Sequence, residues 1–215
     1  MKQYKNYFVE AIGTFALVFC GTGAAIIDEV TNGAVSHAGI AITFGLIVMA
    51  MIYAFGEQSG AHLNPAVSIA FCVNKNFPLK NVLPYIMSQL AGAISASILL
   101  YLLFPSSQLL GASMPAGSEM QSFILEIILT FFLMLVILRV ATGSKEQGLF
   151  AGIAIGSVVL LEAMFAGPIS GASMNPARSL APAIISGHYE HIWIYVTAPV
   201  LGALLAVLIH QLIKE

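Results

Sequence analysis

Charged residues are scarce in this chain. Asp, Glu, Lys and Arg make up only 8% of its 215 residues, whereas 59% are hydrophobic and the mean hydropathy is +0.92. A soluble domain usually carries about 25% charged residues, so these side chains could not cover a surface facing water. Lipid is the alternative solvent. The formal net charge of −2 gives no sign of a nucleic-acid partner.

Cysteine is also rare, and the chemistry that it could supply is missing. Cys20 and Cys72 lie in apolar stretches without the spacing of metal ligands, so we expect buried free thiols. No His or Cys in the apolar segments has a nucleophile, a base or a metal ligand as partner, and an intramembrane enzyme is therefore not expected. The sequence predicts no metal and no cofactor.

Long apolar runs account for most of the chain. The first begins at Tyr7, is too long for the core of a signal peptide and lacks a convincing cleavage site, which indicates an uncleaved membrane helix. Six runs are long enough to cross about 30 Å of hydrocarbon, and turn residues separate them. An even number of spans places both termini on one side. The predicted spans are residues 7–27, 37–55, 82–103, 120–140, 148–166 and 191–212.

The basic residues indicate the orientation of these spans. Seven of the eight fall at the termini and in the connections between spans two and three and between spans four and five, which share one side. Cations concentrate on the cytoplasmic side, so both termini are predicted to be cytoplasmic, and we expect a bacterial cytoplasmic membrane. Arg178 is the eighth, on the opposite side. The seven are Lys2, Lys5, Lys75, Lys80, Arg139, Lys145 and Lys214.

One ten-residue phrase occurs twice. The chain reads SGAHLNPAVS at 59–68 and SGASMNPARS at 170–179, with seven identical positions. The similarity extends further, since Glu10 and Glu126 are each followed four and five residues later by Thr-Phe, and AGIAI begins at Ala38 and at Ala151. Spans one to three therefore match spans four to six.

A repeat with an odd number of spans must be inverted in the membrane. Inverted repeats are typical of channels and transporters, whose site lies near the bilayer midplane. The predicted fold is all-α and integral to the membrane, with six spans in a three-plus-three inverted repeat. The predicted units are a first repeat at 1–104, an outer connecting loop at 105–118 and a second repeat at 119–215.

Each decamer also predicts a short helix. About ten apolar residues follow each Asn-Pro-Ala, which gives roughly 15 Å of helix or half a bilayer. Asn caps a helix N-terminus, and Pro is well placed at the first helical position. We therefore expect two re-entrant half-helices whose positive dipole ends meet at the midplane beside asparagine N–H donors. The motif residues are Asn64, Pro65, Ala66, Asn175, Pro176 and Ala177.

With two such motifs, the chain resembles the aquaporin and aquaglyceroporin (major intrinsic protein) family along essentially all 215 residues. The resemblance implies four protomers with one pore each. It also implies that Arg178 belongs to the outer constriction, that Glu10 and Glu126 hold the re-entrant loops, and that His62 lies by the inner mouth. Glu162, beside the constriction, is left open between a loop acceptor, a partner of Arg178 and an interfacial group.

The other constriction positions implied by the resemblance are Phe44, Ala163 and Ala172. Strict water channels of this family usually have His and Thr or Cys where this chain has the two alanines, so a wider and less polar filter is expected. Typical glycerol facilitators have Asp where this chain has Ser179. The stretches FAGPISGASMNPARSLAPA at 165–183 and IWIYVTAPVLGA at 192–203 are most similar to the nodulin-26-like branch and its bacterial relatives.

The expected function is a passive channel for water and small uncharged solutes such as glycerol, urea and metalloid acids, which excludes ions and protons. Two alternatives stay open. Neighbours such as Phe165 or Met174 could refill the filter and leave a strictly water-selective pore. A coupled secondary transporter is more remote, because it normally needs ionisable groups at the midplane that change occupancy. Trp193 and Tyr195 are predicted to lie in an interfacial aromatic belt.

Overall fold

Six long helices dominate the structure. The computed structural model describes residues 2–144 and 148–213, and within these ranges the chain folds entirely into helices and the turns between them. All six predicted spans are confirmed as helices of sufficient length and hydropathy to cross a membrane. The long helices are α1 (Lys2–Val30), α2 (Ser36–Ser59), α4 (Leu79–Leu103), α5 (Glu119–Ala141), α7 (Ala151–Ser170) and α9 (Ile192–Ile213).

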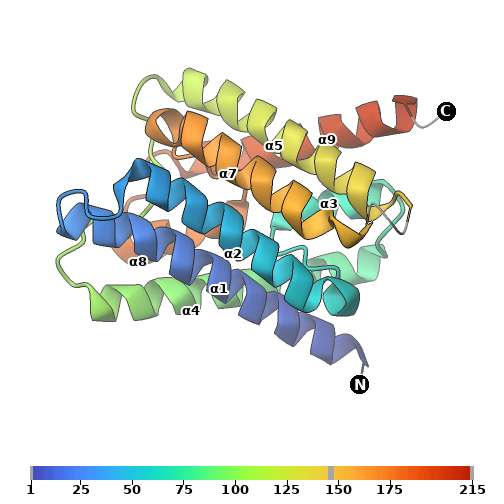
Figure 1. Ribbon diagram of the computed structural model, residues 1–215, viewed down its shortest axis with the longest axis horizontal. Coiled ribbons are helices and arrows are strands. Elements are labelled where there is room, and N and C mark those ends of the chain that lie inside the picture. The colour runs from blue at the N-terminus through green and yellow to red at the C-terminus, as the bar shows by residue number, and fades with distance from the viewer. Residues whose placement is uncertain (1, 145–147, 214–215) are drawn as a thin grey trace.

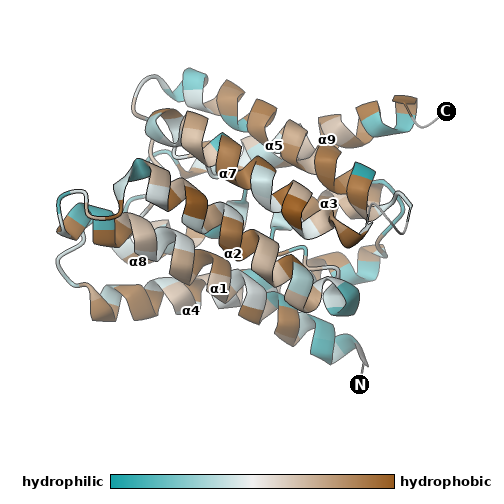
Figure 2. Cartoon of the chain, in the orientation of Figure 1, coloured by the Kyte–Doolittle hydropathy of each residue, from teal (hydrophilic) through white to brown (hydrophobic). Residues whose placement is uncertain are grey.

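The helices run roughly along one direction, and α1 begins at the same end of the bundle at which α9 finishes (Figure 1). Apolar residues occupy the middle of the helices, whereas polar residues gather at their ends and in the connections (Figure 2). Large apolar side chains are exposed on the outer faces, as lipid contact requires. Examples are Phe8 at 68%, Leu83 at 67%, Phe132 at 52%, Leu161 at 64% and Leu205 at 47%.

Two short helices lie between the long ones and enter from opposite ends of the bundle (Figure 1). They are α3 (Pro65–Val73) and α8 (Pro176–Ser186), and each begins at the proline of an Asn-Pro-Ala motif. With 9 and 11 residues they are half the length of a spanning helix. Most of their residues are buried, so they form the centre of the molecule rather than surface loops.

Three of the long helices contain a proline. The fifth span was predicted to occupy residues 148–166, yet α7 begins at Ala151 and continues through Pro168 to Ser170. Pro84 and Pro199 likewise lie inside α4 and α9. A proline in a helix leaves the carbonyl four residues earlier without its usual partner, and in a membrane this carbonyl must find another donor.

Glycine allows the closest helix crossings. A Cβ added at Gly92 of α4 would lie 2.0 Å from the carbonyl oxygen of Ala11 in α1. At the equivalent position of the second repeat, a Cβ on Gly202 of α9 would lie 2.2 Å from the carbonyl oxygen of Ile127 in α5. Both helix pairs therefore depend on small residues for backbone contact, a common device in membranes.

Substitution at this crossing should destabilise the fold. We expect Gly92→Ala to lower the free energy of unfolding by about 1–3 kcal/mol, because α1 and α4 must separate. The measurement is the apparent Tm of the purified protein in detergent. Gly56→Ala is the matched control, since its Cβ would meet only the Ile52 side chain at 3.8 Å. Equal Tm values for the two variants would contradict the prediction.

Candidate functional site

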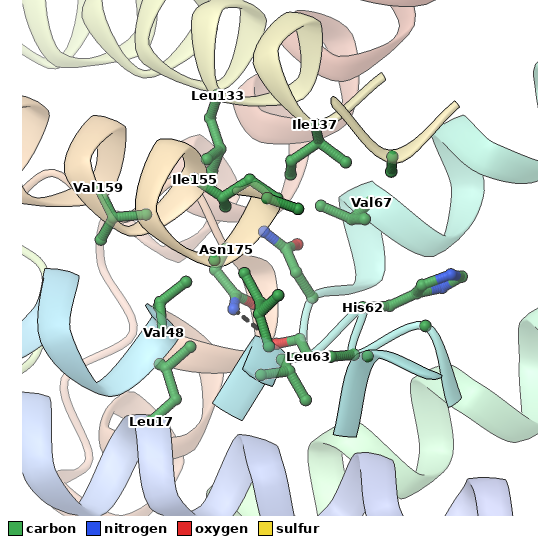
Figure 3. A pocket seen from close by; sticks show the side chains of 18 of the residues that line it. Leu17, Val48, His62, Leu63, Val67, Leu133, Ile137, Ile155, Val159 and Asn175 are labelled. Carbon is green, nitrogen blue, oxygen red and sulfur yellow. Dashed lines mark hydrogen bonds between the residues drawn. The ribbon is translucent and has the colours of Figure 1, made fainter. Parts of the chain in front are cut away.

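A cavity of about 580 Å³ lies between the two repeats. It extends from polar residues such as Glu57 and Asn76 to Arg178. Along its length the wall is mainly aliphatic, with Leu17, Val48, Leu133, Ile137, Ile155 and Val159 arranged around it (Figure 3). The polar groups of the wall come chiefly from the two decamers.

Each half-helix is capped by the asparagine of its motif. The Oδ1 atom of Asn64 accepts from the backbone N–H of Ala66 at 2.9 Å, and that of Asn175 accepts from Ala177 at 3.0 Å and Arg178 at 3.4 Å. Both asparagines have extended backbone, as an N-cap requires. The N-termini of both half-helices therefore open on the cavity wall.

The two loops also exchange hydrogen bonds. Nδ2 of Asn64 donates to the carbonyl of Met174 at 2.8 Å, and Nδ2 of Asn175 donates to the carbonyl of Leu63 at 2.8 Å (Figure 3 shows the second bond). Each bond joins residues more than a hundred positions apart, with separations of 110 and 112. Since each amide nitrogen carries two hydrogens, one N–H of each asparagine serves this contact and the other remains for the cavity that both residues line.

The backbone before each half-helix is strained in the same way. Gly60 and Gly171 adopt φ values of 89° and 82°, which glycine tolerates. Four residues with side chains also have positive φ, a conformation that costs of order 1–3 kcal/mol per residue and needs support from its surroundings. They are Ala61 at 44°, Leu63 at 51°, Ala172 at 41° and Met174 at 55°.

Two buried glutamates bind these strained segments. Glu10 accepts from the backbone N–H groups of His62 and Leu63 at 2.9 and 2.8 Å, and from Ser59 Oγ at 2.7 Å. The side chain is completely buried in α1. Gln89 Nε2 in α4 adds a fourth hydrogen bond at 2.9 Å.

Glu126 makes the equivalent contacts in the second repeat. It accepts from the backbone N–H groups of Ser173 and Met174, both at 2.8 Å, and from Ser170 Oγ at 2.8 Å. It too is completely buried. Each carboxylate therefore accepts hydrogen bonds from two successive backbone N–H groups of one loop.

Two tyrosines support the same loops and were missed in the sequence. Tyr85 Oη donates to the carbonyl of Ser59 at 2.8 Å, and Tyr195 Oη donates to the carbonyl of Ser170 at 2.7 Å. The prediction that Tyr195 belongs to an aromatic belt is wrong, because its side chain is completely buried. A signal was available: each tyrosine stands seven residues before a repeated Gly-Ala pair.

Arg178 occupies the end of the cavity and is 5% exposed. Its Nη1 donates to the carbonyl of Gly111 at 2.9 Å and to Ser113 Oγ at 2.7 Å, so the loop between α4 and α5 holds the guanidinium. Its Cζ lies 5.0 Å from the centre of the Phe44 ring. Nε is buried and has no hydrogen-bond partner among the described residues, which leaves one donor of the guanidinium unused by the protein.

The sequence also gave no sign of the hydroxyl cluster beside Arg178. Ser113 Oγ lies 2.7 Å from Ser179 Oγ, which in turn contacts Ser173 Oγ at 2.5 Å. Ser179 of the second decamer thus contacts the loop between α4 and α5 without introducing a charge next to the guanidinium.

Phe44, Ala163 and Ala172 line the cavity together with Arg178. The Phe44 ring packs against Gly21 of α1, where a Cβ would lie 2.2 Å from the ring. Neither alanine carries a group that could reach across the cavity. Phe165 is 64% exposed and does not line the cavity, whereas Met174 does.

His62 lines the opposite part of the cavity and is held in an aromatic cluster. Its ring centre lies 4.9 Å from that of Phe71, 4.8 Å from that of Phe77 and 5.1 Å from that of Tyr85. Nδ1 lies 3.0 Å from Ser68 Oγ. The imidazole is therefore fixed by packing as well as by hydrogen bonding.

Glu162 does not accept from the second loop. Its Oε2 is buried without a hydrogen-bond partner among residues 2–144 and 148–213. The backbone N–H groups of Ser173 and Met174 bind Glu126 instead. Of the three roles considered for Glu162, the loop acceptor is therefore not the one observed.

Two half-helices that meet head to head at a cavity between inverted repeats define a membrane channel. The chain belongs to the major intrinsic protein family, whose profile matches residues 1–210. It is accordingly an integral, multi-pass channel protein for water and small solutes and not an enzyme.

Known proteins similar to this chain include both plant sequences and a solved structure. It is 47% identical over 211 residues to aquaporin NIP1-1 of Zea mays, covering 98% of this chain and 75% of that protein. It is 46% identical over 206 residues to nodulin-26 of Glycine max, covering 95% and 76%. The X-ray structure of the aquaglyceroporin from Plasmodium falciparum matches with a TM-score of 0.89 at 27% identity, covering 97% and 96%.

Proposed function

We propose that the chain is a passive pore that conducts water and small uncharged solutes, including glycerol, urea and uncharged metalloid acids, while it excludes ions and protons. The observation that carries this proposal is the meeting of the two capped half-helices, where Asn64 and Asn175 each keep an N–H on the cavity wall. A solute can exchange its water hydrogen bonds for those donors and for loop carbonyls as it passes.

Charge exclusion follows from fixed positive potential. Two helix N-termini each contribute about half a positive charge, and Arg178 adds a full charge at the end of the cavity. Cations, including hydronium, are repelled from both places, whereas uncharged molecules are not. Phe44 forms the apolar side of the proposed constriction and Arg178 forms the polar side.

The proposed solute range depends on Ala163 and Ala172. Their short side chains leave the constriction to Phe44 and Arg178, and Phe165 faces away from the cavity. The similarity to a protein named as an aquaglyceroporin supports the same range. A strictly water-selective pore is the second candidate and would require Met174 to narrow the filter.

Coupled transport is not favoured. Coupling needs an ionisable group that can change occupancy, and the buried carboxylates of Glu10 and Glu126 are engaged by the loops. We propose that they, with Pro65 and Pro176 at the first position of each half-helix, hold the loops permanently in place. Their role is structural support for the pore.

Assembly and placement are further parts of the proposal. We place both termini in the cytoplasm because basic residues concentrate at that end, and we propose a homotetramer with a pore in each protomer. Residues 1–104 and 119–215 would form the two repeats, with the 105–118 connection reaching Arg178. A bacterial cytoplasmic membrane stays our expectation, although the relatives named above are plant proteins.

Stopped-flow light scattering on proteoliposomes tests the proposed function. We expect faster relaxation than in protein-free liposomes under water, glycerol and urea gradients, with flux that does not saturate at high solute concentration. A proton gradient across the same vesicles should persist, as read by an internal pH dye. Proton leakage, or solute flux that follows the proton gradient, would refute the proposal.

A further inference from the structure

Pro168 leaves a gap in the hydrogen bonding of α7. A helical carbonyl normally accepts from the N–H four residues later, and Pro168 has none. The carbonyl of Met164 therefore lacks its helical donor. The missing bond falls one residue after Ala163, which lines the cavity.

His37 supplies the missing donor from another helix. It lies in the first turn of α2, and its Nε2 is 2.7 Å from the carbonyl oxygen of Met164. Because a carbonyl can only accept, Nε2 carries the hydrogen. A hydrogen bond between α2 and α7 thus replaces one that α7 could not make by itself.

The imidazole is also fitted to α7 by shape. A Cβ added at Gly167 would lie 2.7 Å from Cε1 of His37 and 3.5 Å from Nδ1. The ring therefore occupies space that any other residue at position 167 would fill. Hydrogen bonding at Met164 and close contact at Gly167 together fix the last two turns of α7 against α2.

The equivalent positions of the two repeats provide an internal comparison. Glu57 stands where Pro168 does, two residues before Ser-Gly-Ala, and Phe150 stands where His37 does, directly before AGIAI. Glu57 retains a backbone N–H, so α2 needs no outside donor at this level. The proline and the histidine that compensates for it therefore occur together, at only one of the two equivalent places.

We propose that His37 is a positioning residue that sets the aperture of the outer constriction. It holds the C-terminal part of α7, which connects Ala163 to Ala172, and both alanines line the cavity. Near the end of α7, the carbonyl of Ile169 accepts from the N–H of Ala116 at 2.9 Å, so this segment is fixed from two sides. This inference rests on the proposed function, because it assigns His37 to the filter of that pore.

A double-mutant cycle separates positioning from general structural support. His37→Phe keeps a ring but removes the donor, and we expect the glycerol-to-water permeability ratio to fall roughly threefold, as the loss of one hydrogen bond implies. Pro168→Ala returns an N–H to position 168. In the Pro168→Ala background, His37→Phe should change the logarithm of the permeability ratio by less than about half of the change that it causes in the unaltered protein.

Two further variants test whether the donor at position 37 is responsible for the effect. His37→Gln offers an amide donor and should keep the ratio near that of the unaltered protein. His188→Phe is the matched control, because the Nδ1 atom of His188 lies 3.2 Å from Oγ of Ser186, at the end of α8. Permeabilities are normalised to the amount of monodisperse protein reconstituted, which removes variants that fail to fold.

An equal fall in the ratio in both backgrounds, or no fall with His37→Phe, would overturn the assignment of His37. If the unaltered protein conducts water but no glycerol, the proposed solute range fails instead, and the same cycle is then measured on water permeability alone. The assignment of His37 and the proposed solute range therefore fail by different results.

Discussion

Glu126→Ala is expected to reduce the water permeability of proteoliposomes by roughly tenfold or more. The change leaves the backbone N–H groups of Ser173 and Met174 and the hydroxyl of Ser170 without their acceptor, because all three donate to Glu126. Each buried donor left without an acceptor costs about 1–3 kcal/mol, and Met174 would lose the support for its positive φ. The second loop should then leave its place at the cavity.

The control for this prediction is Glu119→Ala in the same helix. Glu119 is 48% exposed and pairs with His191 at 2.7 Å, and exposed pairs contribute only about 0–1 kcal/mol. Permeability per reconstituted protein should therefore be unchanged in this variant. Glu126→Ala that conducts water like the unaltered chain would show that the loop does not need its carboxylate.

Ala163→His should distinguish the two candidate solute ranges. An imidazole at this position projects into the cavity beside Phe44 and Arg178, so it narrows the constriction and adds a polar wall. We expect glycerol permeability to fall about tenfold or more and water permeability to fall much less, which is the size of discrimination that one steric change can produce. Stopped-flow measurements under matched glycerol and sucrose gradients give both quantities.

Ala163→Ser serves as its control, because it adds a hydroxyl without filling the aperture. This variant should retain most of the glycerol permeability. If Ala163→His lowers water and glycerol permeability to the same extent, Ala163 does not select between them. If the unaltered chain already rejects glycerol, the strictly water-selective alternative holds.

The sequence predicted the parts of this molecule that depend on local chemistry. Asn-Pro at the start of an apolar decapeptide defines a helix N-terminus whatever surrounds it, so α3 and α8 could be placed to within a residue or two. Hydropathy placed all six spans. The predicted fifth span ended at residue 166, whereas α7 continues through Pro168 to Ser170, and His37, 127 positions from Met164, donates to the Met164 carbonyl.

The missed contacts are those made between distant segments. Nothing near Ser113 in the sequence indicates that its hydroxyl binds Arg178, since the two are separated by 65 positions. Tyr195 was misplaced for a related reason: an aromatic residue near a helix end suits the interface, but here its hydroxyl reaches the carbonyl of Ser170 in the interior. Comparison of the two repeats could have placed Tyr85 and Tyr195 together, because their spacing to Gly-Ala is identical.

The exchanged asparagine bonds have a consequence for how such a duplicated chain can change. Asn64 completes the second loop and Asn175 completes the first, so neither half contains all the groups that its own loop requires. A drift in the shape of one loop would move the acceptor on which the other depends. A substitution that moves one of these loops therefore needs a matching adjustment in the other loop.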